Sequence, residues 1–255
     1  MPYRQAMRTD QIAVQLYTLR SLAAVDLPGT LRAVAAAGYR SVEVAGLPDI
    51  APAELAGMLA DTGLKPIASH EGIAKLREDP ASVADRLVTL GCSRVIVPWM
   101  PEEDRRTVAD VRLFAAEVGR LVPYFADRGI RVGYHNHAFE FAPLEGTTIW
   151  DVLRAELPAE VDLELDVYWV SMGGRDPVTE LRAASDRVRL LHMKDRAPGS
   201  EPHDAPAGQG ILDFPSIVEA GRAAGVEWFI AEQDDASDPV ADIATAYRFL
   251  ASLAG

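Results

Sequence analysis

Short apolar runs alternate along the chain with longer segments that we predict to be helices. The runs are short and mostly apolar, as expected of strands whose two faces are both covered. The predicted strands are residues 12–17, 40–44, 64–69, 94–97, 129–133, 161–166, 188–192 and 227–232. The predicted helices are residues 28–37, 51–62, 81–90, 104–128, 147–157 and 213–224, with two more that open at Asp176 and Asp238.

Glycine, aspartate and proline mark the ends of these helices. Asp176 and Asp238 each precede a proline, which is typical of an N-cap residue followed by the first helical position. Pro123 falls inside the helix predicted at 104–128 and is expected to kink or divide it. Glycine closes five helices just before the next strand, at positions 38, 63, 91, 129 and 225.

Regular alternation of strands and helices predicts parallel strands joined by right-handed crossovers. Eight such units in 255 residues predict an α/β fold, a closed (β/α)₈ TIM barrel that forms a single domain over residues 1–255. An open doubly wound sheet is the alternative, but it more often has a glycine-rich turn after its first strand. Here that strand leads into Thr18, Leu19 and Arg20.

The composition indicates a soluble globular protein, with 49% hydrophobic and 25% charged residues. No run of about 18 apolar residues predicts a membrane span. Residues 1–10 lack the apolar core of a signal peptide, and Cys92 is the single cysteine, so we expect a cytoplasmic protein. A net charge of −13 and a pI near 4.8 argue against a nucleic-acid or anionic-membrane partner. An anionic small substrate stays compatible, because a metal or a local lysine can dominate a pocket.

Polar residues gather where the predicted strands end. His135 and His137 lie two residues apart, so on an extended chain they face the same way. Later strands end at Asp166, His192 and Glu232. In a parallel barrel these ends open on one face, where active sites lie, so we expect the side chains to converge. Other residues at such ends are Gln15, Tyr17, Glu43, His70, Trp99, Lys194 and Asp234.

Asp166, His192 and Glu232, with Glu140 added, form a set of three carboxylates and one imidazole. Oxygen and nitrogen ligands of this kind suit one divalent ion such as Mn²⁺, Mg²⁺, Co²⁺ or Zn²⁺. The alternative is a ring of salt bridges without a metal. Lys194 either holds a substrate oxygen or phosphate or pairs with a carboxylate.

Aromatic and glycine residues near these ends allow two weaker interpretations. Trp99, Trp169 and Phe139 could form an apolar wall for a sugar ring, although packing is the usual role of aromatic residues. Gly208-Gln209-Gly210 is better explained as a flexible turn than as a phosphate cradle.

The chain resembles the sugar phosphate isomerase/epimerase group, the xylose isomerase-like TIM barrels, over nearly its whole length. The matching runs in the first half are Gln15-Leu16-Tyr17-Thr18-Leu19-Arg20, Gly29-Thr30-Leu31, Gly38-Tyr39, Val42-Glu43 and Ala45-Gly46. Those in the second half are His135-Asn136-His137, Glu140-Phe141, His192-Met193-Lys194-Asp195 and Gly210-Ile211-Leu212-Asp213-Phe214.

The resemblance implies a divalent metal held by Glu140, Asp166, His192 and Glu232. Better-known epimerases of the group place their first glutamate directly at the fifth strand's end, where this chain has His135, so His135 is the rival of Glu140 as a ligand. Trp169 is a second departure, because ketose 3-epimerases have a substrate-binding histidine at that position.

We therefore expect a metal-dependent isomerase or epimerase acting on a sugar or polyol by proton transfer next to a carbonyl, through an enediolate. Glu232 and Glu140 are the candidate bases, and His135 and His137 would orient hydroxyls or shuttle protons. Lys194, His70, Glu43 and Trp99 are the remaining substrate-binding candidates.

Three other functions are alternatives to this one. A lyase or dehydratase on a keto-sugar, keto-glycoside or keto-inositol would share the first step. A sugar-binding barrel without activity is a further alternative. An endonuclease IV-type repair enzyme is disfavoured by the charge of −13 and by too few metal ligands.

Overall fold

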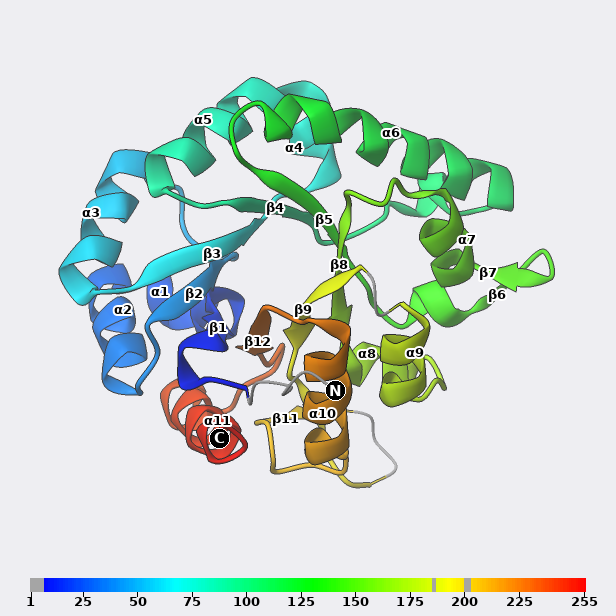
Figure 1. Cartoon of the computed structure of the whole chain (residues 1–255). Helices are drawn as coiled ribbons and strands as arrows, with labels where there is room; N and C mark the ends of the chain where they lie inside the picture. The colour runs from blue at the N-terminus through cyan, green and yellow to red at the C-terminus, as the bar shows by residue number, and fades with distance from the viewer. Residues whose placement is uncertain (1–6, 185–186, 200–202) are drawn as a thin grey trace.

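Eight parallel strands close into a barrel in the computed structural model, which describes residues 7–184, 187–199 and 203–255 (Figure 1). The strand order around the barrel is β1-β12-β9-β8-β5-β4-β3-β2, so the predicted TIM barrel is confirmed. Residues 1–6, most of the stretch used in the signal-peptide argument, lie outside the described residues. The barrel strands are β1 (Ile12–Gln15), β2 (Ser41–Val44), β3 (Lys65–His70), β4 (Arg94–Val97), β5 (Arg131–His135), β8 (Asp162–Asp166), β9 (Val188–His192) and β12 (Trp228–Ala231).

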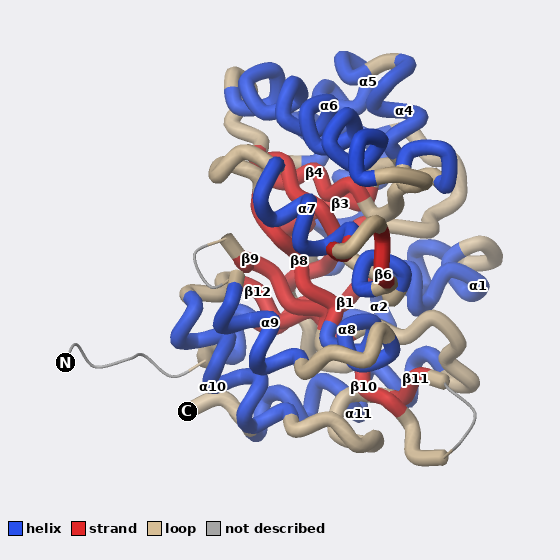
Figure 2. Tube along the Cα trace, turned by 90° about the vertical axis from the view of Figure 1, so that its right-hand side faces the viewer, coloured by secondary structure: helices blue, strands red, loops and turns tan. Residues whose placement is uncertain are grey.

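Helices form an outer layer around these strands, as two perpendicular views show (Figures 1 and 2). None of the described helices is long and apolar enough to cross a membrane. The helices are α1 (Arg20–Ala23), α2 (Leu27–Ala36), α3 (Pro52–Thr62), α4 (Ile73–Glu78), α5 (Pro80–Leu90), α6 (Val108–Ala126), α7 (Ile149–Glu156), α8 (Val167–Met172), α9 (Pro177–Ala183), α10 (Phe214–Ala224) and α11 (Pro239–Ser252).

Helix caps account for most of the boundaries. The side chains of Asp176 and Asp238 accept hydrogen bonds from the backbone N–H groups of Thr179 and Ala241, as the aspartate-proline pairs predicted. The helix expected at 104–128 instead begins at Val108, because Thr107 caps it by accepting from the N–H of Asp110.

Several other predicted boundaries need correction. α6 continues through Pro123 as one helix and ends at Ala126. The first strand is shorter than expected, because residues 16–19 turn into a 3₁₀ helix. A small hairpin that was not among the predicted elements pairs β10 (Asp195–Arg196) with β11 (Asp204–Ala205). A second hairpin joins β6 (Pro143–Leu144) to β7 (Thr147–Thr148).

Two apolar clusters stabilise the barrel. The larger one lies between strands and helices, and a smaller one is made by strand residues that include Ile96, Leu190 and Ile230. Gly133 on β5 leaves space for this inner cluster, because a Cβ there would lie 2.5 Å from Cδ1 of Ile96. The barrel interior is thus a packed core, and the polar strand ends stand above it.

Candidate active site

The carboxyl ends of six strands bring acidic and imidazole side chains together. Glu43 on β2, Glu164 on β8 and His192 on β9 are fully buried, and Glu232 follows β12 with 8% of its surface exposed. His70 ends β3 and His135 ends β5. Residues two apart on a strand face the same side, so Glu164 and Asp166 both reach this site from β8.

His192 lies at the centre of the cluster. Its Nε2 is 2.7 Å from Oε2 of Glu43 and 3.2 Å from Oε2 of Glu164, while its Nδ1 is 2.8 Å from Oε2 of Glu232. Burial disfavours the charged ring, but Glu164 and Glu232 outweigh it and raise the pKa of His192 well above its usual value. The imidazole therefore links carboxylates on both of its sides.

Glu164 joins two further histidines to the cluster. Its Oε2 lies 2.7 Å from Nε2 of His70 and 3.0 Å from Nδ1 of His135. Burial opposes the charge on His70, yet Glu43 and Glu164 raise its pKa to about 10. Burial lowers the pKa of His135 to about 4. Glu164 was not among the residues predicted for the site, although its position two before Asp166 signalled that it faces the same way.

Asp166 is fixed by the start of α8. Its Oδ1 accepts hydrogen bonds from the backbone N–H groups of Tyr168 and Trp169, so one oxygen caps the helix. Its Oδ2 has no hydrogen bond and lies 3.2 Å from Nζ of Lys194. Asn136 accepts from the N–H of Asp166 and ties the end of β5 to that of β8. One oxygen of Asp166 is thus left directed at the site.

Lys194 is buried among carboxylates. Its Nζ lies 2.9 Å from Glu232 and 2.8 Å from Asp234, in addition to Asp166. Burial opposes the charge on Lys194, but these carboxylates outweigh it and raise its pKa well above the usual value. Of the two roles predicted for Lys194, the structure shows the pairing with carboxylates.

The donor set fits a divalent cation. Asp166, His192 and Glu232 each offer a ligand atom, and these atoms lie within 4.8 Å of one another. His70, His135, Glu164 and His192 form a second group by the same measure. Buried oxygens without a hydrogen bond remain on Glu43, Glu164 and Asp166. Because unpaired buried carboxylate oxygens are costly, a cation that ligates them would remove an unfavourable term.

Glu140 lies apart from both groups. It sits in a 3₁₀ turn, Phe139–Phe141, that follows β5 in the chain. Its Oε1 accepts from the hydroxyl of Tyr134 at 2.7 Å and its Oε2 from the N–H of His137 at 2.8 Å. Burial raises the pKa of Glu140 to about 7. The structure therefore places a ring nitrogen of His135 in the second group, while both oxygens of Glu140 accept hydrogen bonds outside the two groups.

A cavity of about 320 Å³ opens above the cluster. Three of the four predicted substrate-binding residues line it, namely His70, Trp99 and Lys194. Glu43 is not in the lining and contacts His70 and His192 instead. Trp99 is 45% exposed and meets the ring of His137 edge-on, with centroids 4.8 Å apart. The full lining is Tyr17, Ala45, Gly46, His70, Pro98, Trp99, His135, His137, Lys194, Glu232 and Asp234.

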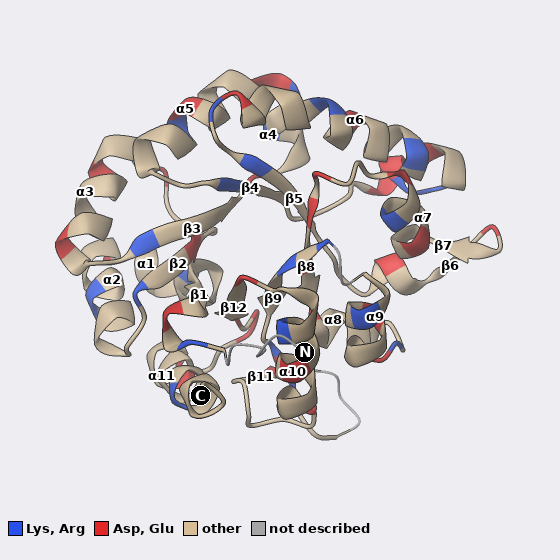
Figure 3. Cartoon of the chain, viewed as in Figure 1, with Lys and Arg blue, Asp and Glu red and all other residues tan. Residues whose placement is uncertain are grey.

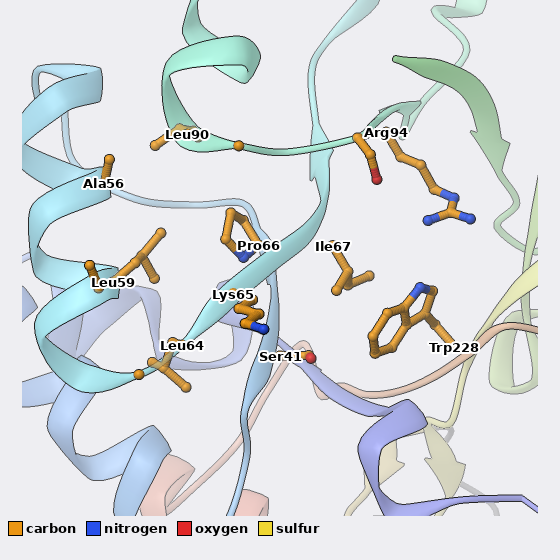
Figure 4. Close-up of a pocket in the computed structure, with 14 residues that line it drawn as sticks. Ser41, Ala56, Leu59, Leu64, Lys65, Pro66, Ile67, Leu90, Arg94 and Trp228 are labelled. Carbon is orange, nitrogen blue, oxygen red and sulfur yellow. The ribbon is translucent and has the colours of Figure 1, made fainter. Parts of the chain in front are cut away.

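A larger cavity, about 530 Å³, lies at the opposite end of the barrel. Figure 4 shows its mostly apolar lining, with Leu59, Ile67 and Trp228 near Lys65 and Arg94. These residues stand where strands begin, and (β/α)₈ enzymes place their chemistry where strands end. We therefore assign the candidate active site to the smaller, acidic cavity.

The outer surface has mixed charge. Figure 3 shows acidic and basic residues interspersed along the outer helices. This arrangement differs from the basic stripe that a nucleic-acid-binding face needs.

Comparisons with known proteins agree with the barrel fold. The model of the family described as xylose isomerase-like TIM barrel matches residues 31–253. An inosose dehydratase of Geobacillus thermodenitrificans is 30% identical over 47% of this chain and 46% of its own length. A 3-dehydroshikimate dehydratase of Pseudomonas aeruginosa is 27% identical over 69% of this chain and 30% of its own length. The chain spans less than half the length of either relative.

Solved structures share the whole architecture. A sugar phosphate isomerase/epimerase from Parabacteroides distasonis is 27% identical, with a TM-score of 0.83, over 94% of this chain and 96% of that one. The IOLI protein, solved with a bound zinc atom, is 16% identical with a TM-score of 0.74 and covers 95% of this chain and 97% of its own. The second likeness concerns the fold alone.

Proposed function

Because the chain belongs to the xylose isomerase-like TIM barrel family, we propose that it moves a proton at the carbon next to a carbonyl of a sugar or polyol, giving an isomer or epimer. The observation that carries this proposal is the cluster of carboxylates and imidazoles, with unpaired oxygens, beneath a cavity of about 320 Å³. Such a cavity lies at the small end of the range for ligand pockets, so it suits a single sugar-sized molecule.

Asp166, His192 and Glu232 are the residues we assign to one divalent ion. Glu164, His70 and His135 form the neighbouring group that shares His192. When bound, the ion would supply Lewis-acid polarisation of a carbonyl and an adjacent hydroxyl. Mn²⁺, Mg²⁺, Co²⁺ and Zn²⁺ all accept this mixture of oxygen and nitrogen ligands.

Glu232 is the proposed base. Burial acts to raise its pKa, but Lys194 and His192 outweigh that effect and hold the pKa well below the usual value. The carboxylate is therefore ionised at neutral pH, and it lines the cavity. Lys194, 2.9 Å away, keeps its charge and can stabilise negative charge that develops on a substrate oxygen.

His137 lines the cavity beside Trp99 and is our candidate for orienting a substrate hydroxyl. Burial lowers its pKa to about 2, so the ring is neutral at pH 7, and its buried Nδ1 has no hydrogen-bond partner. The second base predicted from the sequence, Glu140, holds the loop that carries His137 through the His137 N–H. We therefore assign Glu140 a positioning role.

A dehydratase is the second candidate function, because both curated relatives carry that name. It would begin with the same proton removal by Glu232. The electron pair left on that carbon would form the new C=C bond as the C–O bond of a β-hydroxyl breaks. The C–O electrons would leave with the oxygen, which departs as water after it takes a proton from a neighbouring acid. The two functions share residues and differ in product.

Deuterium exchange separates these possibilities. Metal-loaded protein is incubated in D₂O with ketoses and keto-inositols, and the products are followed by NMR and mass spectrometry. Deuterium next to the carbonyl with an isomer formed supports the isomerase, and deuterium with loss of water supports the dehydratase. Glu232→Gln should lose exchange, whereas Glu219→Gln, the same change on the exposed face of α10, should retain it. Binding without exchange across the panel would refute the proposal.

A further inference from the structure

The hairpin β10–β11 carries two buried carboxylates into the loops at the mouth of the barrel. Asp195 begins β10 and is 1% exposed, and Asp204 begins β11 and is 9% exposed. Each accepts hydrogen bonds from backbone N–H groups of a loop that follows one of the last two barrel strands. These are the two loops from which (β/α)₈ barrels frequently build a phosphate site.

Asp195 fills the amide cradle of the loop after β9. Its Oδ2 accepts from the N–H groups of Gly208 and Gly210 at 3.0 and 2.8 Å, and its Oδ1 from those of Arg196 and Leu212 at 2.8 and 3.1 Å. A Cβ on Gly210 would lie 2.4 Å from Oδ1 of Asp195, so glycine permits the close approach. The Gly208-Gln209-Gly210 run is therefore an anion cradle whose anion belongs to the protein.

Asp204 acts in the same way on the loop after β12. Its Oδ2 accepts from the N–H groups of Asp234 and Asp235. The N–H of Gln233 is also taken, by the hydroxyl oxygen of Thr18 at 2.9 Å. The backbone donors that a phosphate group would need in this second loop are thus committed to side chains of the chain itself.

The cationic side chains offer a phosphate group little compensation. Lys194 is the only lysine or arginine among the described residues that line the cavity, and it contacts the carboxylates of Asp166, Glu232 and Asp234. Arg105 is not among the residues that line the cavity, and its guanidinium stacks on Phe139, 3.5 Å from the ring centroid. His70 also lines the cavity and contacts Glu43 and Glu164, so a dianionic phosphate would have to compete with carboxylates for both Lys194 and His70.

We infer that the substrate of this site is an unphosphorylated polyhydroxy carbonyl compound, and that Asp195 and Asp204 occupy the positions where a phosphate group would bind. The inference rests on the proposed function for the site's action on sugar-like molecules. Hydroxyl groups can donate hydrogen bonds to the many carboxylates at the mouth. A phosphate monoester is largely dianionic at pH 7, because its second pKa is about 6, and it then has no proton to donate to them. The same charges therefore favour a neutral substrate.

Inorganic phosphate is the direct probe. Chelator-treated full-length protein is titrated with phosphate by calorimetry and by thermal unfolding, against potassium chloride at equal ionic strength. Wild type should show no saturable binding and no phosphate-specific rise in Tm. Asp195→Ala empties the cradle, so it should bind phosphate at least about tenfold more tightly than wild type and gain a phosphate-dependent rise in Tm. Asp213→Ala, which removes an exposed helix cap instead, should not.

A second measurement covers the case in which Asp195→Ala fails to fold. Wild-type protein is offered a ketose and its terminal phosphate ester in the D₂O assay, and the free ketose should exchange at least about tenfold faster at equal concentration. Saturable phosphate binding by wild type, or preference for the ester, would overturn the inference. If no carbonyl compound exchanges, the proposed reaction is refuted. The phosphate titration still tests whether Asp195 fills a phosphate position, because it does not depend on exchange.

Discussion

Glu140 should make the stability of the protein depend on pH through its buried carboxyl group. Burial raises its pKa to about 7 from the ordinary 4.5, a difference of 7 − 4.5 = 2.5 units. At 1.36 kcal/mol per unit, this corresponds to roughly 3 kcal/mol. A raised folded-state pKa favours the protonated form, so the contribution is fully present below pH 4.5 and is lost as the pH rises through 7.

Glu140→Gln replaces the protonated acid by a neutral group of the same shape. The amide can donate to the oxygen of Tyr134 and accept from the N–H of His137, so the two contacts are retained. The variant should gain stability relative to wild type by roughly 3 kcal/mol between pH 4 and pH 8, which is roughly 6–12 °C in Tm for a chain of this size. Because Glu140 lies outside both ligand groups, the metal affinity of the Glu140→Gln variant should stay within about threefold of the wild-type affinity.

Urea unfolding at several pH values measures this difference, with metal titrations at pH 7.5 on the same preparations. Other titrating groups cancel in the comparison of variant with wild type. Glu219→Gln on α10, which is exposed, should follow the wild-type curve throughout. A constant offset between Glu140→Gln and wild type from pH 4 to 8 would contradict the burial argument, and a hundredfold loss of metal would make Glu140 a ligand after all.

Three further perturbations address other parts of the account. His192→Ala should weaken metal binding at least about 100-fold by isothermal titration, because it removes a ligand common to both groups. Unchanged affinity would exclude both groups as the metal site. Trp99→Ala should leave the urea midpoint nearly unchanged, since the ring is 45% exposed, yet weaken sugar binding by about 0.5–1.5 kcal/mol; equal affinity would remove Trp99 from the substrate wall. Gly133→Ala should lower the free energy of unfolding by about 1–3 kcal/mol, because its Cβ would lie 2.5 Å from Cδ1 of Ile96. Wild-type stability of this variant would show that the inner cluster can repack around the added methyl group without loss.

The barrel could be predicted from sequence because its signals are local and repeated. Short apolar runs, aspartate-proline helix starts and glycine helix ends each report on a few neighbouring residues, and eight repeats leave few topologies. The helix start at Val108 was misplaced because the deciding contact is the cap between Thr107 and Asp110, a signal that the acidic residues before it obscured. Pro123 lies inside α6 without dividing it.

The site was predictable where a residue ends a strand and less so where it stands on a loop. Asp166, His192 and Glu232 converge because parallel strands deliver their ends to one face. Glu140 lies in a 3₁₀ turn after β5, where strand periodicity no longer indicates which way a side chain faces. Glu164 could have been predicted, because it lies two residues before Asp166 and its side chain points to the same side of the strand. It was missed because a carboxylate is unusual in the interior of a buried strand.

The Gly208-Gln209-Gly210 motif alone could not show that the carboxylate of Asp195 fills its backbone cradle. The glycine pair at 208 and 210 is thirteen and fifteen residues away in the chain, and the hairpin that joins them to Asp195 has only short strands. A lone glycine pair carries no information about which anion it will hold.

Anomalous diffraction from crystals grown with Mn²⁺ would show which side chains hold the metal. One strong peak is expected in the mouth of the barrel, about 2.0–2.3 Å from a ligand atom of each of Asp166, His192 and Glu232. A peak held by His70, His135 and Glu164 without Asp166, a peak at Glu140, or no peak at the strand ends would contradict this assignment.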